Sequence, residues 1–222
     1  TTELQSFCKE KDILFIEDSA QSLGSSLNGV KAGTIGDCSV YSFNSNKVIA
    51  GINGGGVVLT DNEDIANRVK MIRRHGKDKD FSMLGYNSRM YVLNGMIINQ
   101  RMKNAQRNQD RRQTVAKRYN EAFSDLPVTT QHTGNGLNHN FHKYVVRFED
   151  KDTRKRVKNV LKASIHYETP LSANSMYDSV ECRRDACTAS KTAADTVLSL
   201  PVHAYLTDEE IEWIIGLFRN AI

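Results

Sequence analysis

Short apolar runs and alternating stretches, separated by polar segments rich in glycine, characterise the first part of the chain. Residues 13–16 form a continuous apolar run, as in a strand that is covered on both faces. Residues 38–43 alternate between apolar and polar side chains and predict a second strand, and residues 54–60 predict a third. The small, polar segment 19–36 is expected to be largely loop.

Helical periodicity appears between and after these strands. Residues 4–11 predict the end of an amphipathic helix. A second helix begins at residues 61–64, where capping and acidic side chains precede apolar positions on one face. Residues 90–123 are expected to be mostly helical, with a break near residues 104–110. Strands combined with helices in this way predict an α/β sheet domain.

A smaller α+β domain is predicted for the C-terminal part of the chain. Its expected elements are a strand at 143–148, a basic helix at 152–162, a short strand at 164–167, a helix at 187–198 and a last helix capped by Thr207. Glu210 stands three residues after Thr207, which is the spacing of a capping box. The polar connector 127–140 is the candidate boundary, so a large domain at 1–126 and a small domain at 127–222 are predicted.

The composition is that of an ordinary globular protein. The 222 residues are 39% hydrophobic and 25% charged, and the net charge of +4 is too small to demand a nucleic-acid partner. No apolar stretch approaches the roughly 20 residues of a membrane helix. The first residues, Thr1-Thr2-Glu3, do not begin a signal peptide, and the absence of a first methionine indicates a fragment or a processed form.

The cysteines favour a reduced, cytoplasmic protein without a metal site. The sequence contains four of them, Cys8, Cys38, Cys182 and Cys187, and none is paired in the Cys-x-x-Cys spacing of a zinc site. Scattered cysteines in a chain of this length are typical of free thiols in the cytosol.

One lysine and its surroundings point to chemistry. Lys47 follows the strand predicted at 38–43, and a glycine-rich turn at 51–56 comes next. Asp18 ends the preceding strand, and the carboxyl ends of such strands form the edge where open α/β sheets bind ligands. A lysine amine can hold pyridoxal 5'-phosphate (PLP) as a Schiff base, while an acid keeps the pyridine nitrogen protonated. The pair therefore favours a PLP enzyme, although the glycines alone are weak evidence.

A recognisable segment begins at the end of the first predicted strand, Ile16-Glu17-Asp18-Ser19-Ala20-Gln21-Ser22-Leu23-Gly24. It is similar to the EDAAQALG segment of the DegT/DnrJ/EryC1/StrS family, fold-type I PLP aminotransferases that mostly aminate nucleotide-linked keto-sugars. The likeness continues, in order and over nearly the whole chain, at residues 33–37, 42–47, 74–76, 84–90, 165–167, 199–201 and 206–210. The resemblance implies part of a fold-type I large domain, with a mixed, mostly parallel sheet, followed by a small C-terminal α+β domain.

The resemblance also implies roles at the matched positions. Lys47 would hold the cofactor and, with its amine free, move the proton between substrate and cofactor. Asp18 would pair with the pyridine nitrogen, Gln21 would lie near the phenolic oxygen, and Ser42 would hold the phosphate. Asn87 would reach the phosphate in the partner subunit, because family members are homodimers with shared active sites. The positions expected near the sugar nucleotide are Arg89, His166 and Tyr167.

The implied function is transfer of an amino group, from glutamate, to the keto carbon of a nucleotide-linked sugar, in amino-sugar synthesis for cell-surface glycans or secondary metabolites. Lys47 argues against the sugar dehydratases of the family, which place histidine there. A truncated, non-catalytic or regulatory relic of the same fold is the alternative, and the sequence leaves it open. The shape of the pocket, rather than these motifs, sets the sugar, the nucleotide and the carbon aminated.

Two departures from the family's pattern change the expectations. Asn53 stands where many members have a glutamate before paired glycines, and residues 42–47 lean toward members that aminate C4 of UDP-linked sugars. The chain also begins just before the strand that carries Asp18, without the family's N-terminal part. We therefore expect an exposed apolar sheet edge, and weak or no binding of PLP by this polypeptide alone.

Plainer interpretations stay open at several positions. Ser42 can point outward from its strand, Gln21 can be a loop residue, and His166 and Tyr167 can be structural. The helical segment also carries a group of basic residues, Arg101, Lys103, Arg107, Arg111, Arg112, Lys117 and Arg118. A solvated helix face explains this group better than a nucleic-acid surface, because no aromatic residues are interleaved and acids balance the charge.

Overall fold

The computed structural model describes residues 2–77, 82–181 and 187–222, so Cys182 lies outside the described residues. The chain forms two compact units. The first comprises Thr1–Asp110 and Thr133–His142, and the second comprises Arg111–His132 and Lys143–Ile222. The domain division between residues 126 and 127 stays a prediction.

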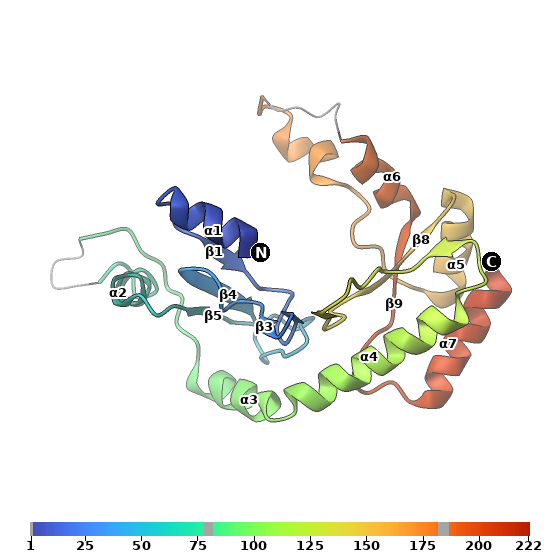
Figure 1. Ribbon diagram of the computed structural model, residues 1–222, viewed down its shortest axis with the longest axis horizontal. Coiled ribbons are helices and arrows are strands. Elements are labelled where there is room, and N and C mark those ends of the chain that lie inside the picture. Colours follow the sequence, from blue (N-terminus) through green and yellow to red (C-terminus); the bar gives the residue numbers. More distant parts are fainter. Residues whose placement is uncertain (1, 78–81, 182–186) are drawn as a thin grey trace. The chain divides into compact units, whose positions relative to one another are not determined.

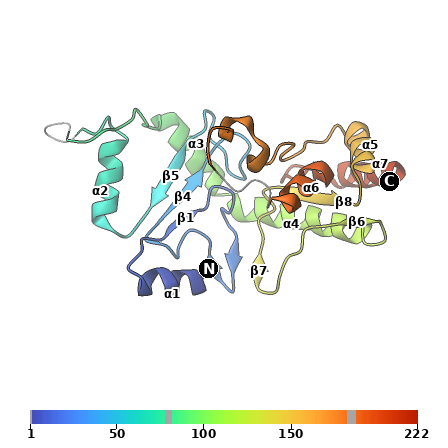
Figure 2. The ribbon, with the colours of Figure 1, turned by 90° about the horizontal axis from the view of Figure 1, so that it is seen from above.

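The first unit is built on a three-stranded sheet with the strand order β1-β4-β5. β1 (Ile16–Asp18) and β4 (Cys38–Ser42) run parallel, and β5 (Gly56–Leu59) runs antiparallel to β4. The three strands lie side by side in both ribbon views (Figures 1 and 2). The second and third predicted strands are therefore confirmed, and the sheet is mixed.

The apolar run at 13–16 is not a strand covered on both faces. β1 begins only at Ile16, which is 62% exposed, and Leu14 before it is 70% exposed. Within the part of the chain that the structure describes, β1 pairs with β4 alone and is an edge strand. The expected exposed apolar edge is present because β1 has a neighbouring strand on one side only.

The helices of the first unit follow local signals in the sequence. α1 spans Thr2–Glu10. α2 spans Glu63–Ile72, and the side chain of its N-cap Asn62 accepts hydrogen bonds from two backbone N–H groups of the first turn. α3 spans Val92–Met102. A short break separates α3 from α4 (Ala105–Ala122), and it lies at the start of the range 104–110 where the sequence predicts a break. Helix α4 continues into the second unit.

A small hairpin interrupts the loop predicted after the first strand. β2 (Ser26–Leu27) pairs with β3 (Val30–Lys31) and, on its other side, with β7 (Leu137–Asn138). Asn28 and Gly29 between β2 and β3 have positive φ angles of 51° and 83°. Such a pair is typical of a two-residue hairpin turn, so Asn-Gly was the sequence signal for this hairpin.

The second unit contains an antiparallel sheet with the order β6-β8-β9. Its strands are β6 (Val128–Thr129), β8 (Tyr144–Phe148) and β9 (Val197–Leu200). The helix predicted at 187–198 is shorter, because α6 (Thr188–Thr196) ends where β9 begins. Residues 197–200 become a strand by pairing with β8, a long-range interaction that helical periodicity does not reveal.

The predicted strand at 164–167 is wrong. Its backbone pairing with β9 is limited, in the described chain, to an isolated bridge between Ser164 and Ser199, so no strand forms. The remaining elements of the unit are α5 (Lys151–Leu161), the short 3-10 helices η1 (Leu171–Ala173) and η2 (Ser175–Tyr177), and α7 (Asp208–Ala221).

An aromatic cluster forms the core of the second unit. Tyr119 and Phe123 of α4 stack with 5.6 Å between ring centroids, and Phe123 stacks on Phe218 of α7 at 4.1 Å. Tyr144 of β8 is fully buried, and its hydroxyl donates to Asn120 Oδ1 at 2.6 Å. This packing holds α4, α7 and β8 together.

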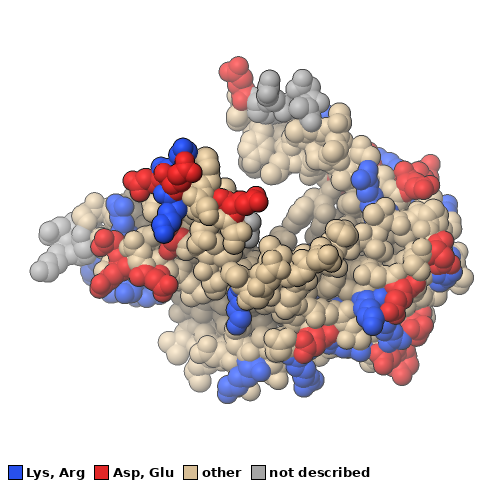
Figure 3. Space-filling model, in the orientation of Figure 1, with Lys and Arg blue, Asp and Glu red and all other residues tan. Residues whose placement is uncertain are grey.

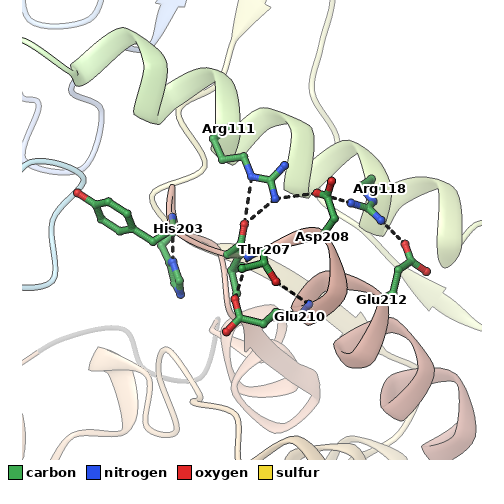
Figure 4. A network of polar contacts seen from close by, with 9 residues as sticks. Arg111, Arg118, His203, Thr207, Asp208, Glu210 and Glu212 are labelled. Carbon is green, nitrogen blue, oxygen red and sulfur yellow. Dashed lines mark hydrogen bonds and ion pairs between the residues drawn. The ribbon is translucent and has the colours of Figure 1, made fainter.

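Ion pairs also connect α7 to α4 (Figure 4). Arg111 and Arg118 of α4 contact Asp208 Oδ1 at 2.8 and 2.7 Å, and Arg118 also pairs with Glu212. The hydrogen bond from Arg111 is the main cause that lowers the pKa of Asp208. Two of the basic residues in the helical segment are therefore engaged within the protein.

The capping box predicted at the start of α7 is confirmed (Figure 4). The backbone N–H of Glu210 donates to Thr207 Oγ1 at 3.2 Å, and the backbone N–H of Thr207 donates to Glu210 Oε2 at 2.8 Å. Two N–H groups that the helix itself leaves without partners are satisfied in this way.

Candidate functional site

Asp18 and Ser42 lie at the carboxyl ends of two neighbouring parallel strands. Asp18 stands opposite Val40 in the β1–β4 register, and Ser42 follows two residues later. Because side chains alternate along a strand, Asp18 and Ser42 lie on the same face of the sheet. The Asp18 carboxylate is exposed and accepts one hydrogen bond, from the backbone N–H of Ala20 at 3.1 Å. This edge is where the sequence places the chemistry.

Lys47 lies on a loop that leaves the end of β4 and closes back on it. The backbone N–H of Phe43 donates to Gly55 O at 2.8 Å, and the N–H of Gly51 donates to Phe43 O at 2.7 Å. Lys47 is half-buried, and no described residue forms a hydrogen bond or ion pair with its side-chain amine. Lys47 thus lies on the loop that follows Ser42 at the end of β4, and none of the described residues engages its amine.

The glycines after Lys47 are needed for the turn. Gly54 and Gly55 have φ angles of 71° and 125°, which other residues rarely adopt. A Cβ atom at Gly51 would lie 2.5 Å from Asn94 Oδ1. The groups that approach the backbone of Gly51 closely are therefore Gly54 O and the side chain of Asn94 on α3.

Gln21 lies in the turn after β1, and a residue that the sequence analysis missed holds this turn. Asn140 is 2% exposed, and its Nδ2 donates to Gln21 O at 2.9 Å and to Leu23 O at 3.0 Å. Its Oδ1 accepts from the backbone N–H of His142 at 3.0 Å. No local pattern marks Asn140, because these partners of its side chain are all backbone groups and two of them are far away in the sequence.

Glu17 is a second residue that the sequence analysis missed. Its carboxylate accepts hydrogen bonds from the backbone N–H groups of Gly33, Ile35 and Gly36, at 2.8, 2.6 and 2.7 Å. Glu17 therefore fixes the loop that enters β4 against β1, next to Asp18. A carboxylate at the end of an apolar run was the only signal in the sequence.

Asn87 and Arg89 lie in the segment between α2 and α3. Asn87 forms an isolated antiparallel bridge with Arg74, just after α2. Arg89 lines a pocket of about 980 Å³ whose walls come from β4, β5, α2 and the residues that lead into α3. Neither side chain forms a hydrogen bond with Lys47 or Asp18 in the described chain.

His166 and Tyr167 belong to the second unit. His166 Nδ1 lies 2.9 Å from Ser199 Oγ of β9, and burial, together with the charge of Lys143, lowers the pKa of His166. The rings of His166 and Tyr167 meet edge to face at 5.6 Å, and Tyr167 is 69% exposed. The histidine is thus attached to the sheet, whereas the tyrosine is open to a partner or a ligand.

The basic helical segment does not form a continuous positive surface. Arg112 is 8% exposed and donates to Val202 O at 2.8 Å, and burial lowers its pKa. On the face shown in Figure 3, acidic and basic side chains are interspersed over each unit. The structure therefore favours the interpretation of a helix face that is partly solvated and partly packed.

None of the described helices combines the length and the apolar character that a membrane span requires.

The family model described as the DegT/DnrJ/EryC1/StrS aminotransferase family matches residues 1–219, and the chain belongs to this family. A pleiotropic regulatory protein of Geobacillus stearothermophilus is 27% identical, with 96% of this chain and 59% of that protein covered. The UDP-N-acetyl-3-dehydro-alpha-D-glucosamine 3-aminotransferase of Acidithiobacillus ferrooxidans is 25% identical, with 99% and 60% covered. The chain spans about 60% of the length of these relatives.

A solved structure confirms the fold class. The putative sugar aminotransferase Spr1654 from Streptococcus pneumoniae, in its PLP form, matches with a TM-score of 0.86 at 22% identity. The match covers 97% of this chain and 59% of that one. The described units therefore have the fold of the corresponding part of a fold-type I aminotransferase.

Proposed function

We propose that the complete polypeptide to which this chain belongs is a PLP-dependent aminotransferase. It transfers an amino group from glutamate to the keto carbon of a nucleotide-linked sugar. Family membership over residues 1–219 supports the reaction class, and the Acidithiobacillus relative, named as an aminotransferase of a UDP-linked sugar, supports the substrate class. The observation that carries the proposal is the parallel register that sets Asp18 and Ser42 on one face of the sheet, next to the loop of Lys47.

The residues at this edge fit the cofactor by their chemistry. Asp18 offers a carboxylate for a ring N–H, Ser42 offers a hydroxyl for a phosphate, and Lys47 offers a primary amine. When bound, PLP supplies an electron sink for the substrate carbon. Asp18 would accept the hydrogen bond of the pyridine N–H and keep that proton in place. Lys47 Nζ would hold the cofactor between turnovers and move the proton on and off the substrate carbon.

The remaining roles extend this proposal. The side chain of Gln21 lies near the phenolic oxygen of the ring. Asn87 acts across a homodimer on the phosphate of the partner's cofactor. It pairs with Arg74 just after α2, and its side chain forms no hydrogen bond with Lys47 in the described chain, so it is available for this role. Arg89, His166 and Tyr167 bind the sugar nucleotide. The free thiols of Cys8 and Cys38 support a cytoplasmic location.

A non-catalytic, regulatory role is the second candidate. The name of the Geobacillus relative, a pleiotropic regulatory protein, is the observation that favours it. This role does not require an amine that is free to react at Lys47, so the chemistry of Lys47 separates the two candidates.

The test is a borohydride-trapping experiment with PLP, on the complete polypeptide and on the 222-residue chain. Absorbance spectra before and after borohydride are followed by peptide mapping of the lysines. Lys47→Ala is compared with Lys31→Ala, which removes an exposed lysine on β3. We expect the complete polypeptide to fix PLP on Lys47 in wild type and Lys31→Ala only, and this chain alone to bind weakly.

Two results would overturn the proposal. The first is PLP fixed on other lysines while Lys47 stays unmodified. The second is fixation on Lys47 without amine transfer from glutamate to any nucleotide-linked keto-sugar, which would leave the regulatory candidate.

A further inference from the structure

One face of α3 holds the loop that carries Lys47. Asn94, Ile98 and Arg101 are spaced by four and three residues, so they lie on the same side of the helix. All three contact the loop between Phe43 and Gly55. These contacts lie within the first unit and involve none of the residues assigned above to cofactor or substrate.

Asn94 makes the central contact. It is 7% exposed, and its Oδ1 accepts from the backbone N–H of Ile52 at 2.8 Å. Its Nδ2 donates to Gly54 O at 2.7 Å. Because the oxygen and the nitrogen of the amide are both engaged, the two groups fix the orientation of the side chain and of the glycine turn. Burial makes each bond costly to lose, since the backbone group would stay without water.

Two further contacts fix the residues between Lys47 and the turn. Ile49 is 1% exposed and packs in an apolar cluster with Phe43 and Ile98. Arg101 Nη1 donates to Ala50 O at 2.5 Å. Lys47 is therefore two residues from a buried anchor, and the chain after that anchor is held at Ala50, Ile52 and Gly54 by α3.

We infer that Asn94 is a positioning residue for Lys47: by holding Ile52 and Gly54 it fixes the closed loop that presents the lysine amine at the sheet edge. The inference rests on the proposed role of Lys47. Asn94 itself touches neither substrate nor cofactor in this proposal, because both ends of its amide are occupied by backbone groups. Without it the loop stays attached through Ile49 but samples more conformations, and the amine is presented less often in the reactive geometry.

The test compares Asn94→Ala and Asn94→Asp with Asn99→Ala, which removes an exposed asparagine of the same helix. Hydrogen exchange is measured on peptides that cover residues 44–56. The rate of acetylation of Lys47 is measured by mass spectrometry relative to Lys31 and Lys70. Trapping of PLP on Lys47 by borohydride, and the visible spectrum before reduction, complete the set. The first two readouts need no cofactor.

For Asn94→Ala we expect amide exchange in residues 44–56 to accelerate roughly threefold to tenfold, as for the loss of one or two hydrogen bonds. We expect the acetylation rate of Lys47 to change while those of Lys31 and Lys70 do not. Asn94→Asp keeps the acceptor for Ile52 and should be intermediate, and Asn99→Ala should equal wild type.

Unchanged exchange and unchanged Lys47 reactivity in Asn94→Ala would overturn the inference, as would an equal change in Asn99→Ala. Faster exchange with unaltered Lys47 reactivity would also overturn it, because Asn94 would then be only structural. Failure of wild-type Lys47 to bind PLP would instead contradict the proposed function, and the acetylation comparison would still decide whether Asn94 controls the lysine.

Discussion

The buried amide of Asn140 donates a hydrogen bond to the backbone oxygen of Gln21, although 119 positions separate the two residues in the sequence. The same nitrogen donates to Leu23 O, so Asn140 determines the path of the chain just after β1. This part of the chain contains Asp18 and Gln21, the two residues proposed to flank the cofactor ring. A residue of the polar connector thus shapes the site without belonging to it.

We expect Asn140→Ala to destabilise the protein by about 2 to 3 kcal/mol, because two buried carbonyl groups lose their donor. Urea unfolding measures this change in the free energy of unfolding. Asn135→Ala, an exposed position in the same connector, is the matched control and should be close to neutral. A near-neutral Asn140→Ala would show that water or a rearranged loop satisfies Gln21 and Leu23.

Asp18→Asn should leave the fold intact and lower the rate of amine transfer of the complete polypeptide by roughly a hundredfold or more. The amide cannot carry the negative charge that keeps a proton on the pyridine nitrogen. Stopped-flow measurement of single half-reactions with glutamate gives the rate. Asp61→Asn, at an exposed position between β5 and α2, should have wild-type rates. Equal rates for Asp18→Asn and wild type would remove Asp18 from the site.

Asp125 provides a pH prediction in the second unit. Arg219 Nη1 and Nη2 contact its two carboxylate oxygens at 2.7 Å each, and these hydrogen bonds lower the pKa of Asp125 to about 2. A pKa below the unfolded value means that the pair stabilises the protein above about pH 4 and loses this effect as the pH falls toward 2. The thermal midpoint of wild type should therefore exceed that of Arg219→Gln at neutral pH, and the difference should shrink in acid.

Part of that difference should persist at low pH, because Arg219 also donates to Ala122 O, which does not titrate. Arg107→Gln, at an exposed arginine of α4 without an ion pair in the described chain, is the control and should show no pH-dependent difference. A wild-type advantage that is constant from neutral pH to pH of about 2 would contradict the role of the Asp125 charge.

The parts of the fold that the sequence predicts well are those with local causes. β4 shows its alternation, α2 has the capping side chain of Asn62, and Thr207 and Glu210 form the capping box of α7. β9 is decided by its pairing with β8, and the segment 164–167 is no strand because it pairs with β9 only through the bridge between Ser164 and Ser199; a single segment encodes neither outcome. The edge with Asp18 and Ser42 is predictable from strand ends.

The residues that support this edge are not predictable in the same way. Asn94, Asn140 and Glu17 each bind backbone groups of other segments, and any polar residue has a backbone within reach in some fold. Only the folded chain selects the partner. Sequence patterns therefore indicate the reacting groups, whereas the geometry that positions them comes from long-range contacts.

The exposed apolar edge at β1 leads to a last prediction, about association. Ile13, Leu14 and Ile16 are 52%, 70% and 62% exposed, and β1 offers an unpaired strand edge in the described sheet. Such an edge favours pairing with another strand, and burial of these side chains adds to it. We expect the purified chain to associate as its concentration rises, as followed by light scattering.

Leu14→Lys should weaken this association by roughly tenfold, the equivalent of burying one large apolar side chain. Val160→Lys adds the same charge at an apolar residue of α5 that is 43% exposed, and it should associate like wild type. If the chain stays monomeric at every concentration, or if both variants weaken association equally, the β1 edge is not the contact. The difference between the two lysine variants identifies the edge, because a general effect of charge on solubility would act at both positions.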